Sequence, residues 1–316
     1  MSKGELELVR WLAGVVKSRP GPSSDIIQNR VAIDIGDDMA GLRLSGGQLL
    51  LLSSDMIVEG THFDRKIHKL EAIGRKALCC GLSDVAAMAA KPLAALVSLA
   101  LPRDEVFEIG RPLLSGLMAA ADEFECAVVG GDTTSWHDRL AVDVALVAEP
   151  WPDCRAVTRK GAQPGDLLVV TGRLGGSRLG KHLDFTPRLA EARQLVQTLG
   201  DDLHAMIDIT DGLSLDLSRL CAASACGATL SEPALQKVIA ADARTAAGED
   251  GRSALQHALS DGEDFELLFA VAPQAESKLH SLDFELHVIG RVSHEGLTIE
   301  DSTGQSTPLQ PEGYEH

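Results

Sequence analysis

No apolar run in this sequence of 316 residues reaches the length of a membrane span. The first residues also lack the character of a secretory signal, because the acidic Glu5 stands where such a signal needs basic and apolar residues. These two absences favour a cytoplasmic protein without a membrane partner.

Basic residues are scarce, with 29 Lys and Arg against 46 Asp and Glu, for a formal net charge of −17. Binding along a nucleic-acid backbone needs a basic excess that displaces counterions from the phosphates. The composition therefore argues against DNA or RNA as a partner. Most of the negative charge is expected to serve solubility, and some of the acids are expected to bind metal ions.

Paired cysteine motifs are absent too, since none of the six cysteines forms a CxxC pair and most lie in apolar surroundings. This is typical of core thiols in a reducing compartment and does not indicate disulfides or a zinc site. No Ser/His or Cys/His pair stands in a G-x-S-x-G turn, so a nucleophilic triad has little support.

A phosphate-binding P-loop is nearly present at residues 175–182, GGSRLGKH. The motif requires Ser or Thr after the lysine, because that hydroxyl binds Mg²⁺, and His182 stands there instead. We therefore expect no P-loop. A glycine-rich turn from strand to helix could still direct backbone N–H groups at phosphate.

The length and a hydrophobic fraction of 45% fit one large or two ordinary domains. The Pro-containing stretch 149–153 interrupts the pattern and predicts a boundary between residues 1–150 and 151–316. Strands and helices mix without strict βαβ alternation. This predicts two α+β domains, each with helices on one face of its sheet.

Apolar periodicity predicts the individual elements. Helices are expected at 5–17, 69–90, 104–124, 188–199 and 213–224. Strands are expected at 31–35, 49–52, 93–101, 126–129, 140–148, 167–171, 206–209, 227–230, 265–271, 286–292 and 297–299. Loops are expected at 20–24 and 242–252.

One pattern recurs along the chain: an apolar strand runs into a turn that delivers a carboxylate. At residues 128–134, VVGGDTT, two β-branched residues precede two glycines and Asp132. Similar turns carry Asp38, Asp55, Asp208 with Asp211, and Glu263 with Asp264. Asp84 lies in an Ala-rich helix among apolar neighbours, so we expect its side chain to face a cavity. The repetition predicts one shared acidic site.

Carboxylates gathered in this way would repel one another by several kcal/mol unless cations neutralise them. Several Mg²⁺ ions that share one polyphosphate would resolve this repulsion. The sequence thus predicts phosphoryl transfer, which needs positioning and charge neutralisation more than covalent work by the protein. His62 follows Asp55 by seven residues and is a candidate for contact with substrate.

These stretches resemble the thiamine-monophosphate kinase family, in the superfamily of aminoimidazole ribonucleotide synthetase and selenophosphate synthetase. The resemblance runs through most of the chain. Its motifs are 4–6 (GEL), 35–38 (IGDD), 54–63 (SDMIVEGTHF), 76–77 (KA), 82–88 (LSDVAAM), 130–134 (GGDTT), 158–159 (TR), 164–166 (PGD), 170–172 (VTG), 207–213 (IDITDGL), 262–267 (GEDFEL) and 313–316 (GYEH).

The resemblance implies transfer of the γ-phosphate of ATP to thiamine monophosphate by direct in-line attack, with several Mg²⁺ ions, to give thiamine diphosphate. It implies a two-domain fold like that of aminoimidazole ribonucleotide synthetase. It also implies a homodimer in which N-terminal strands of both subunits close a barrel, which removes sheet edges.

The resemblance also assigns roles to individual residues. The implied metal ligands are Asp38, Ser53, Ser54, Asp55, Asp84, Asp132, Asp208 and Asp211. The residues implied to face ATP are Gly131, Asp132, Arg159 and Thr210, and those implied to face thiamine phosphate are His62, Glu263 and Tyr314. The implied catalytic set is Asp55, Asp132, Arg159 and Asp211. Arg159 suits its role because a guanidinium can neutralise a phosphate in transfer.

Four features depart from the family pattern: Gly81 in place of Asn, Leu114 in place of a Tyr near adenine, Gly176 in place of Asp, and a shortened segment 184–188. All the metal carboxylates are present, so binding of Mg-nucleotide is expected. Two alternatives stay open. One is a divergent paralogue that phosphorylates another small acceptor, and the other is a catalytically weak Mg-nucleotide-binding protein with a scaffold or regulatory role.

Overall fold

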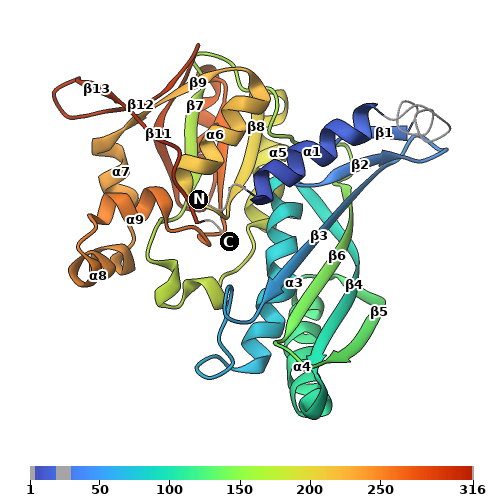
Figure 1. Cartoon of the computed structure of the whole chain (residues 1–316). Helices are drawn as coiled ribbons and strands as arrows, with labels where there is room; N and C mark the ends of the chain where they lie inside the picture. Colours follow the sequence, from blue (N-terminus) through green and yellow to red (C-terminus); the bar gives the residue numbers. More distant parts are fainter. Residues whose placement is uncertain (1–3, 19–29, 315–316) are drawn as a thin grey trace.

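The computed structural model describes residues 4–18 and 30–314. The expected loop at 20–24 and the last two residues of the closing motif, Glu315 and His316, lie outside these ranges. Figure 1 shows two β-sheet domains that meet beside helix α3 (Leu70–Ala87), with α1 (Gly4–Ser18) as a separate helix. None of the described helices is long and apolar enough to cross a bilayer.

The N-terminal sheet has six strands in the order β1-β2-β3-β6-β4-β5, with helices α3 and α4 (Val106–Glu123) packed together beside it. Only the pair β4 and β5 is parallel among its described pairings. The strands are β1 (Val31–Ile33), β2 (Ala40–Arg43), β3 (Leu49–Val58), β4 (Ala90–Pro102), β5 (Ala127–Trp136) and β6 (Ala141–Pro150).

Two of the predicted carboxylate turns are wrong, because the strands continue through them. Strand β3 runs through Ser53, Ser54 and Asp55, and β5 runs through the glycines to Trp136. The pairing of β5 with β4 is irregular between Val128 and Gly130, and Gly131 lies opposite Val97. A Cβ at Gly131 would stand 1.7 Å from the carbonyl oxygen of Val97, so glycine is needed for close approach of two backbones and not for a turn.

The C-terminal sheet has seven strands in the order β13-β12-β9-β11-β7-β10-β8. Its strands are β7 (Leu167–Thr171), β8 (Leu203–Ile209), β9 (Gly227–Ser231), β10 (Glu266–Val271), β11 (Leu286–Ser293), β12 (Leu297–Glu300) and β13 (Ser306–Pro308). Its helices are α5 (Leu189–Leu199), α6 (Leu213–Ser224), α7 (Glu232–Val238), α8 (Ala241–Asp250), α9 (Ala254–Ser260) and α10 (Glu276–Leu279).

The prediction of helices on one face of each sheet is wrong for this C-terminal sheet. Leu167 and Val169 of β7 belong to a core shared with α3 and α5. Leu168 and Val170 belong to a second core formed with α6, α7 and α9. A strand buried on both faces is apolar at every position, and β7 therefore lacks the alternation that marks a half-covered sheet.

The loop predicted at 242–252 is also wrong, because α8 covers most of it. Apart from the buried Ala243, the side chains of α8 are largely exposed, so the segment has no apolar stripe that would predict a helix. Gly251 ends the helix in the left-handed conformation, with a φ of 80°.

Within residues 4–18 and 30–314, one face of the N-terminal sheet is open. Met56, Leu96 and Val129 leave 59%, 45% and 65% of their surface exposed on β3, β4 and β5.

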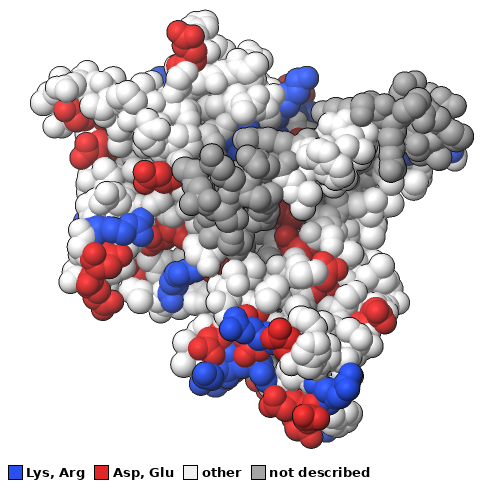
Figure 2. Space-filling model, viewed as in Figure 1, with Lys and Arg blue, Asp and Glu red and all other residues white. Residues whose placement is uncertain are grey.

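Figure 2 shows one side of the molecule, where basic and acidic side chains of the described residues lie together at the lower end. Among the ion pairs of the described residues, Arg65 pairs with Glu59 and Glu105.

Candidate active site

A cavity of about 600 Å³ lies between the two domains. Its walls come from β3, from the loop after β3, from α3, from the linker that follows β6, and from loops of the C-terminal domain. The lining residues are Asp38, Ser53, Ser54, Asp55, Met56, Ile57, Val58, His62, Cys80, Asp84, Arg159, Thr210, Asp211, Glu263, Phe265 and Tyr314. Side chains from both domains therefore face one space.

An acidic cluster adjoins this cavity, with Asp38 and Asp84 in its lining and Asp208 buried next to them. Carboxylate oxygens of Asp38, Asp84 and Asp208 all lie within 4.8 Å of one another. Asp38 follows β1, Asp84 is on α3 and Asp208 is on β8, so three distant segments supply one oxygen-rich point. The hydroxyl of Ser83 donates a hydrogen bond of 2.5 Å to Asp208 and orients it.

The donor set fits Mg²⁺. Asp38 Oδ2 and the hydroxyl of Ser53 are buried and have no hydrogen-bond partner among the described residues. Buried polar atoms without a partner are costly, whereas oxygen atoms of this kind are the ligands that Mg²⁺ prefers. The residues present could therefore hold the cation that the acidic sequence motifs predict.

Burial and mutual repulsion raise the pKa values of the carboxyl groups in this cluster. Burial raises the pKa of Asp55 from 3.8 to about 6, and the charges of Asp143 and Asp38 add to this while a hydrogen bond with Asp84 opposes it. Burial and the charge of Asp55 raise the pKa of Asp84 well above its ordinary value. Burial and the charge of Asp38 do the same to the pKa of Asp208. A bound cation would relieve this repulsion.

The raised pKa of Asp55 predicts how the stability of the metal-free protein depends on pH. The folded protein without metal binds protons more tightly at Asp55 than the unfolded chain does, so its stability should fall as pH rises from about 4 to about 6. Mg²⁺ should therefore stabilise the protein more at about pH 7.5 than at about pH 5. The two increases in unfolding free energy should differ by on the order of a few kcal/mol, and the increase in melting temperature should be larger at the higher pH. Thermal unfolding with EDTA or MgCl₂ at both pH values measures this, and equal metal effects would contradict it.

Arg159 is the cation that faces the cluster. Its Nε donates a hydrogen bond of 3.1 Å to Asp38, and its backbone N–H lies 3.2 Å from Asp37 Oδ1. Burial opposes its charge, yet the carboxylates of Asp38, Asp208 and Asp37 raise its pKa. The guanidinium thus stays charged inside the cavity, where a phosphate could replace or share its carboxylate partner.

The turn after β8 is fixed by a residue that the sequence analysis missed. Asp216, fully buried on α6, accepts hydrogen bonds of 3.0 to 3.1 Å from the backbone N–H groups of Thr210, Asp211 and Gly212. Arg219 bridges Asp216 and Asp211. The available sequence signal was an acid in the first turn of a helix, where it can accept such bonds.

The other end of the cavity holds His62, Glu263 and Tyr314. His62 Nδ1 accepts a hydrogen bond of 3.0 Å from the backbone N–H of Val58. The hydroxyl of Tyr314 donates to the carbonyl oxygen of Thr61. The C-terminal tail is thereby attached to the loop after β3, and the three residues expected to face the acceptor line one wall.

Gly131 and Asp132 do not line this cavity. Asp132 shares a cross-strand row with Ser98, Asp143 and Met56, which places it on the open face of the sheet. Asp55 directly precedes Met56 on β3, and successive side chains of a strand point to opposite faces, so Asp55 points away from the open face. Strands β6 and β4 separate β5 from β3, a span of about 14 Å at ~4.8 Å per strand. Leu114, on α4, does not line the cavity either.

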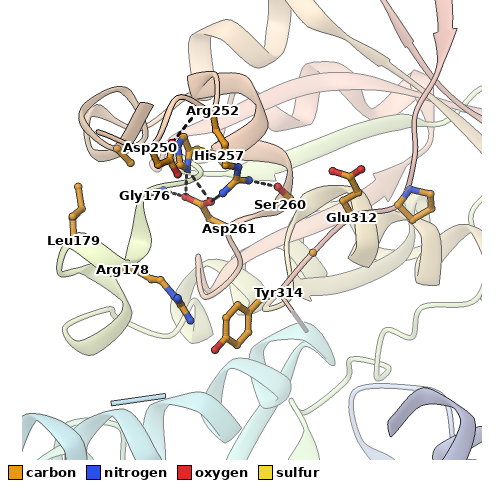
Figure 3. A pocket seen from close by; sticks show the side chains of 13 residues that line it. Gly176, Arg178, Leu179, Asp250, Arg252, His257, Ser260, Asp261, Glu312 and Tyr314 are labelled. Atoms are coloured by element: carbon orange, nitrogen blue, oxygen red, sulfur yellow. Dashed lines mark hydrogen bonds and ion pairs between the residues drawn. The ribbon is translucent and has the colours of Figure 1, made fainter. Parts of the chain in front are cut away.

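Figure 3 shows a second cavity, of about 640 Å³, against which Tyr314 also lies. The Arg178 guanidinium stacks over the Tyr314 ring at 4.3 Å, so this pair forms a wall of the second cavity. Farther in, His257 lies between Asp250 and Asp261. The charged groups there are largely paired with one another.

The glycines of the near-P-loop form hydrogen bonds and close packing contacts within the C-terminal domain. The N–H groups of Gly175 and Gly176 donate to Asp264 and Asp261, so carboxylates of the protein already occupy them. Gly176 has a φ of 74°, and a Cβ there would stand 2.3 Å from the backbone nitrogen of Ala243. The close approach of α8 therefore accounts for glycine at this departure from the family pattern.

Two further departures have equally local explanations. A Cβ at Gly81 would stand 2.7 Å from Leu146 and 3.5 Å from Asp55, so this position packs directly behind the acidic cluster. In the shortened segment 184–188, Phe185 stacks on Phe265, a lining residue, with ring centroids 3.7 Å apart. Arg188 binds the buried Glu266 through two hydrogen bonds of 2.8 Å. The segment is anchored despite its shortness.

Comparison with known proteins agrees with this geometry. Residues 36–149 match the N-terminal domain, and residues 168–301 the C-terminal domain, of AIR synthase related proteins. The thiamine-monophosphate kinase of Rhodopirellula baltica is 39% identical over 300 residues, covering 91% of this chain and 92% of that protein. That of Salmonella typhimurium is 35% identical over 318 residues, covering 90% and 92%.

A solved structure, AaThiL complexed with AMPPCP and TMP, superposes with a TM-score of 0.78. It is 28% identical in sequence and covers 99% of this chain and 97% of its own. Similarity therefore extends over both domains and over the cavity between them. The chain belongs to the thiamine-monophosphate kinase family of AIR synthase related proteins.

Proposed function

We propose that this protein transfers the γ-phosphate of ATP directly to the phosphate of thiamine monophosphate, giving thiamine diphosphate and ADP, with several Mg²⁺ ions. One observation carries the proposal. Asp38 and Asp84, which form an oxygen cluster with the buried Asp208, line the same cavity as His62, Glu263 and Tyr314. A polyphosphate and a small acceptor can therefore meet at one point.

The residues divide into two groups by chemistry. Ser53, Asp55 and Asp211 extend the oxygen donors on the nucleotide side, whereas the hydroxyl of Ser54 donates a hydrogen bond of 2.8 Å to Asp143. When bound, Mg²⁺ would neutralise the phosphates and hold their oxygens in line. An oxygen of the acceptor phosphate forms the new bond to phosphorus as the bond to ADP breaks, so no protein base has to remove a proton. Arg159 is the cation placed to stabilise charge on the transferring group.

The nucleotide side is incomplete within one chain. Asp132 is exposed on the open face of the N-terminal sheet, and the apolar side chains Met56, Leu96 and Val129 are largely exposed there among the described residues. A second copy that packs its own sheet there would bury these side chains and bring its Asp132 toward this site. The proposed assembly is therefore a homodimer whose two sites each use Gly131 and Asp132 from the other subunit.

The test mixes purified protein with Mg-ATP and thiamine monophosphate and measures thiamine diphosphate and ADP by chromatography. We expect equal amounts of both products, and none when the divalent cation is removed with EDTA. Binding of ATP without any product would contradict the proposal and favour the regulatory alternative. Faster turnover with another phosphorylated acceptor would favour the divergent paralogue.

A further inference from the structure

Lys76 is a fully buried lysine on α3, with 0% of its surface exposed. An ammonium group removed from water costs several kcal/mol unless carboxylates and hydrogen bonds compensate it. Both kinds of partner are present. The Nζ atom pairs with Glu263 Oε1 at 2.5 Å and donates a hydrogen bond of 3.0 Å to the carbonyl oxygen of His62.

These two partners come from different domains but line the same part of the cavity. His62 lies in the loop after β3, and Glu263 in the loop before β10. Both line the cavity together with Tyr314. One buried group therefore ties the two acceptor-side loops to a rigid helix.

Glu263 needs such support. Its backbone has a φ of 54°, a left-handed conformation that is uncommon for residues other than glycine. Strained backbone of this kind persists when surrounding contacts hold it, and here its N–H donates to the carbonyl oxygen of Thr210 at 2.6 Å. The ion pair with Lys76 fixes the side chain as well.

We propose that Lys76 is a positioning residue for the acceptor. It holds the His62 loop and the Glu263 carboxylate in fixed positions relative to each other. It also neutralises the charge of Glu263 where phosphate groups must enter the cavity. The inference rests on the proposed function. The cavity already contains the carboxylates of Asp38, Asp55, Asp84 and Asp211, so a further uncompensated acid would repel an incoming phosphate.

The first test compares Lys76→Met with Lys278→Met. Lys278 forms an ion pair with Asp202 on the surface, 45% exposed and away from the cavity, and serves as the matched control. We expect Lys76→Met to raise the KM for thiamine monophosphate by about tenfold or more, with the KM for Mg-ATP changed less than about twofold. Lys278→Met should match the wild type. Equal increases in both KM values would overturn the proposal.

The second test uses Glu263→Gln and does not depend on catalysis or on Lys76→Met folding. Glu263 reaches the His62 loop through Lys76, so loss of its charge should speed hydrogen exchange in residues 59–64 as well as in 261–265. Exchange in strand β7 should not change. Unchanged exchange in 59–64 would overturn the inference. If the wild type makes no thiamine diphosphate, the proposed function fails, whereas this exchange result still decides the role of Lys76.

Discussion

Replacement of Asp55 by asparagine is expected to lower kcat by on the order of a thousandfold or more, equivalent to about 4 kcal/mol of transition-state stabilisation. Asp55 lines the cavity beside Asp84, and its charge is part of the repulsion that a cation would neutralise. Asparagine preserves the shape of the side chain but removes the charge that a cation needs. Rapid-quench or steady-state assays of thiamine diphosphate formation measure the loss.

The fold of the Asp55→Asn variant should remain intact. Removal of one of several mutually repelling carboxylates should leave the melting temperature without metal equal to or above that of the wild type. The increase in melting temperature on adding Mg²⁺ should shrink. Asp201→Asn, which alters a fully exposed carboxylate, is the control and should behave as the wild type in both measurements. Wild-type rates in Asp55→Asn would mean that the metal site lies elsewhere.

Mixed dimers are expected to regain activity from two inactive variants, Asp55→Asn and Asp132→Asn. If each site combines Asp55 of one subunit with Asp132 of the other, a mixed dimer has one intact site and one site with both changes. Random association makes half of the dimers mixed, so co-expression should restore about a quarter of wild-type activity. Each variant alone should be close to inactive.

The control pairs Asp55→Asn with Asp84→Asn. Both residues line the cavity of the same chain, so every mixed dimer would carry one defect in each site and no activity should return. Recovery with Asp132→Asn but not with Asp84→Asn would establish the shared site. Absence of recovery in both mixtures would mean that Asp132 acts within its own subunit or outside the site.

Much of the fold followed from local pattern. Helices α3, α4, α5 and α6 and strands β4, β6 and β7 were predicted within a few residues, because apolar periodicity reports which face of an element is covered. The helix α8 was missed because its exposed side chains carry no such stripe. The glycines of β5 were misjudged because close backbone approach and tight turns place the same demand on a residue, namely the lack of a Cβ.

The sequence by itself determined which chemical groups are available: oxygen ligands, one well-placed guanidinium at Arg159, and the motifs that assign the family. Such features are short and local, so they can be read without coordinates. Only the tertiary structure decided which groups meet. Alternation along β3 directs Asp55 into the cavity, while Asp132 lies across the sheet on its open face. The pair of Lys76 and Glu263 joins residues 187 positions apart, a separation at which sequence pattern carries no information about contact.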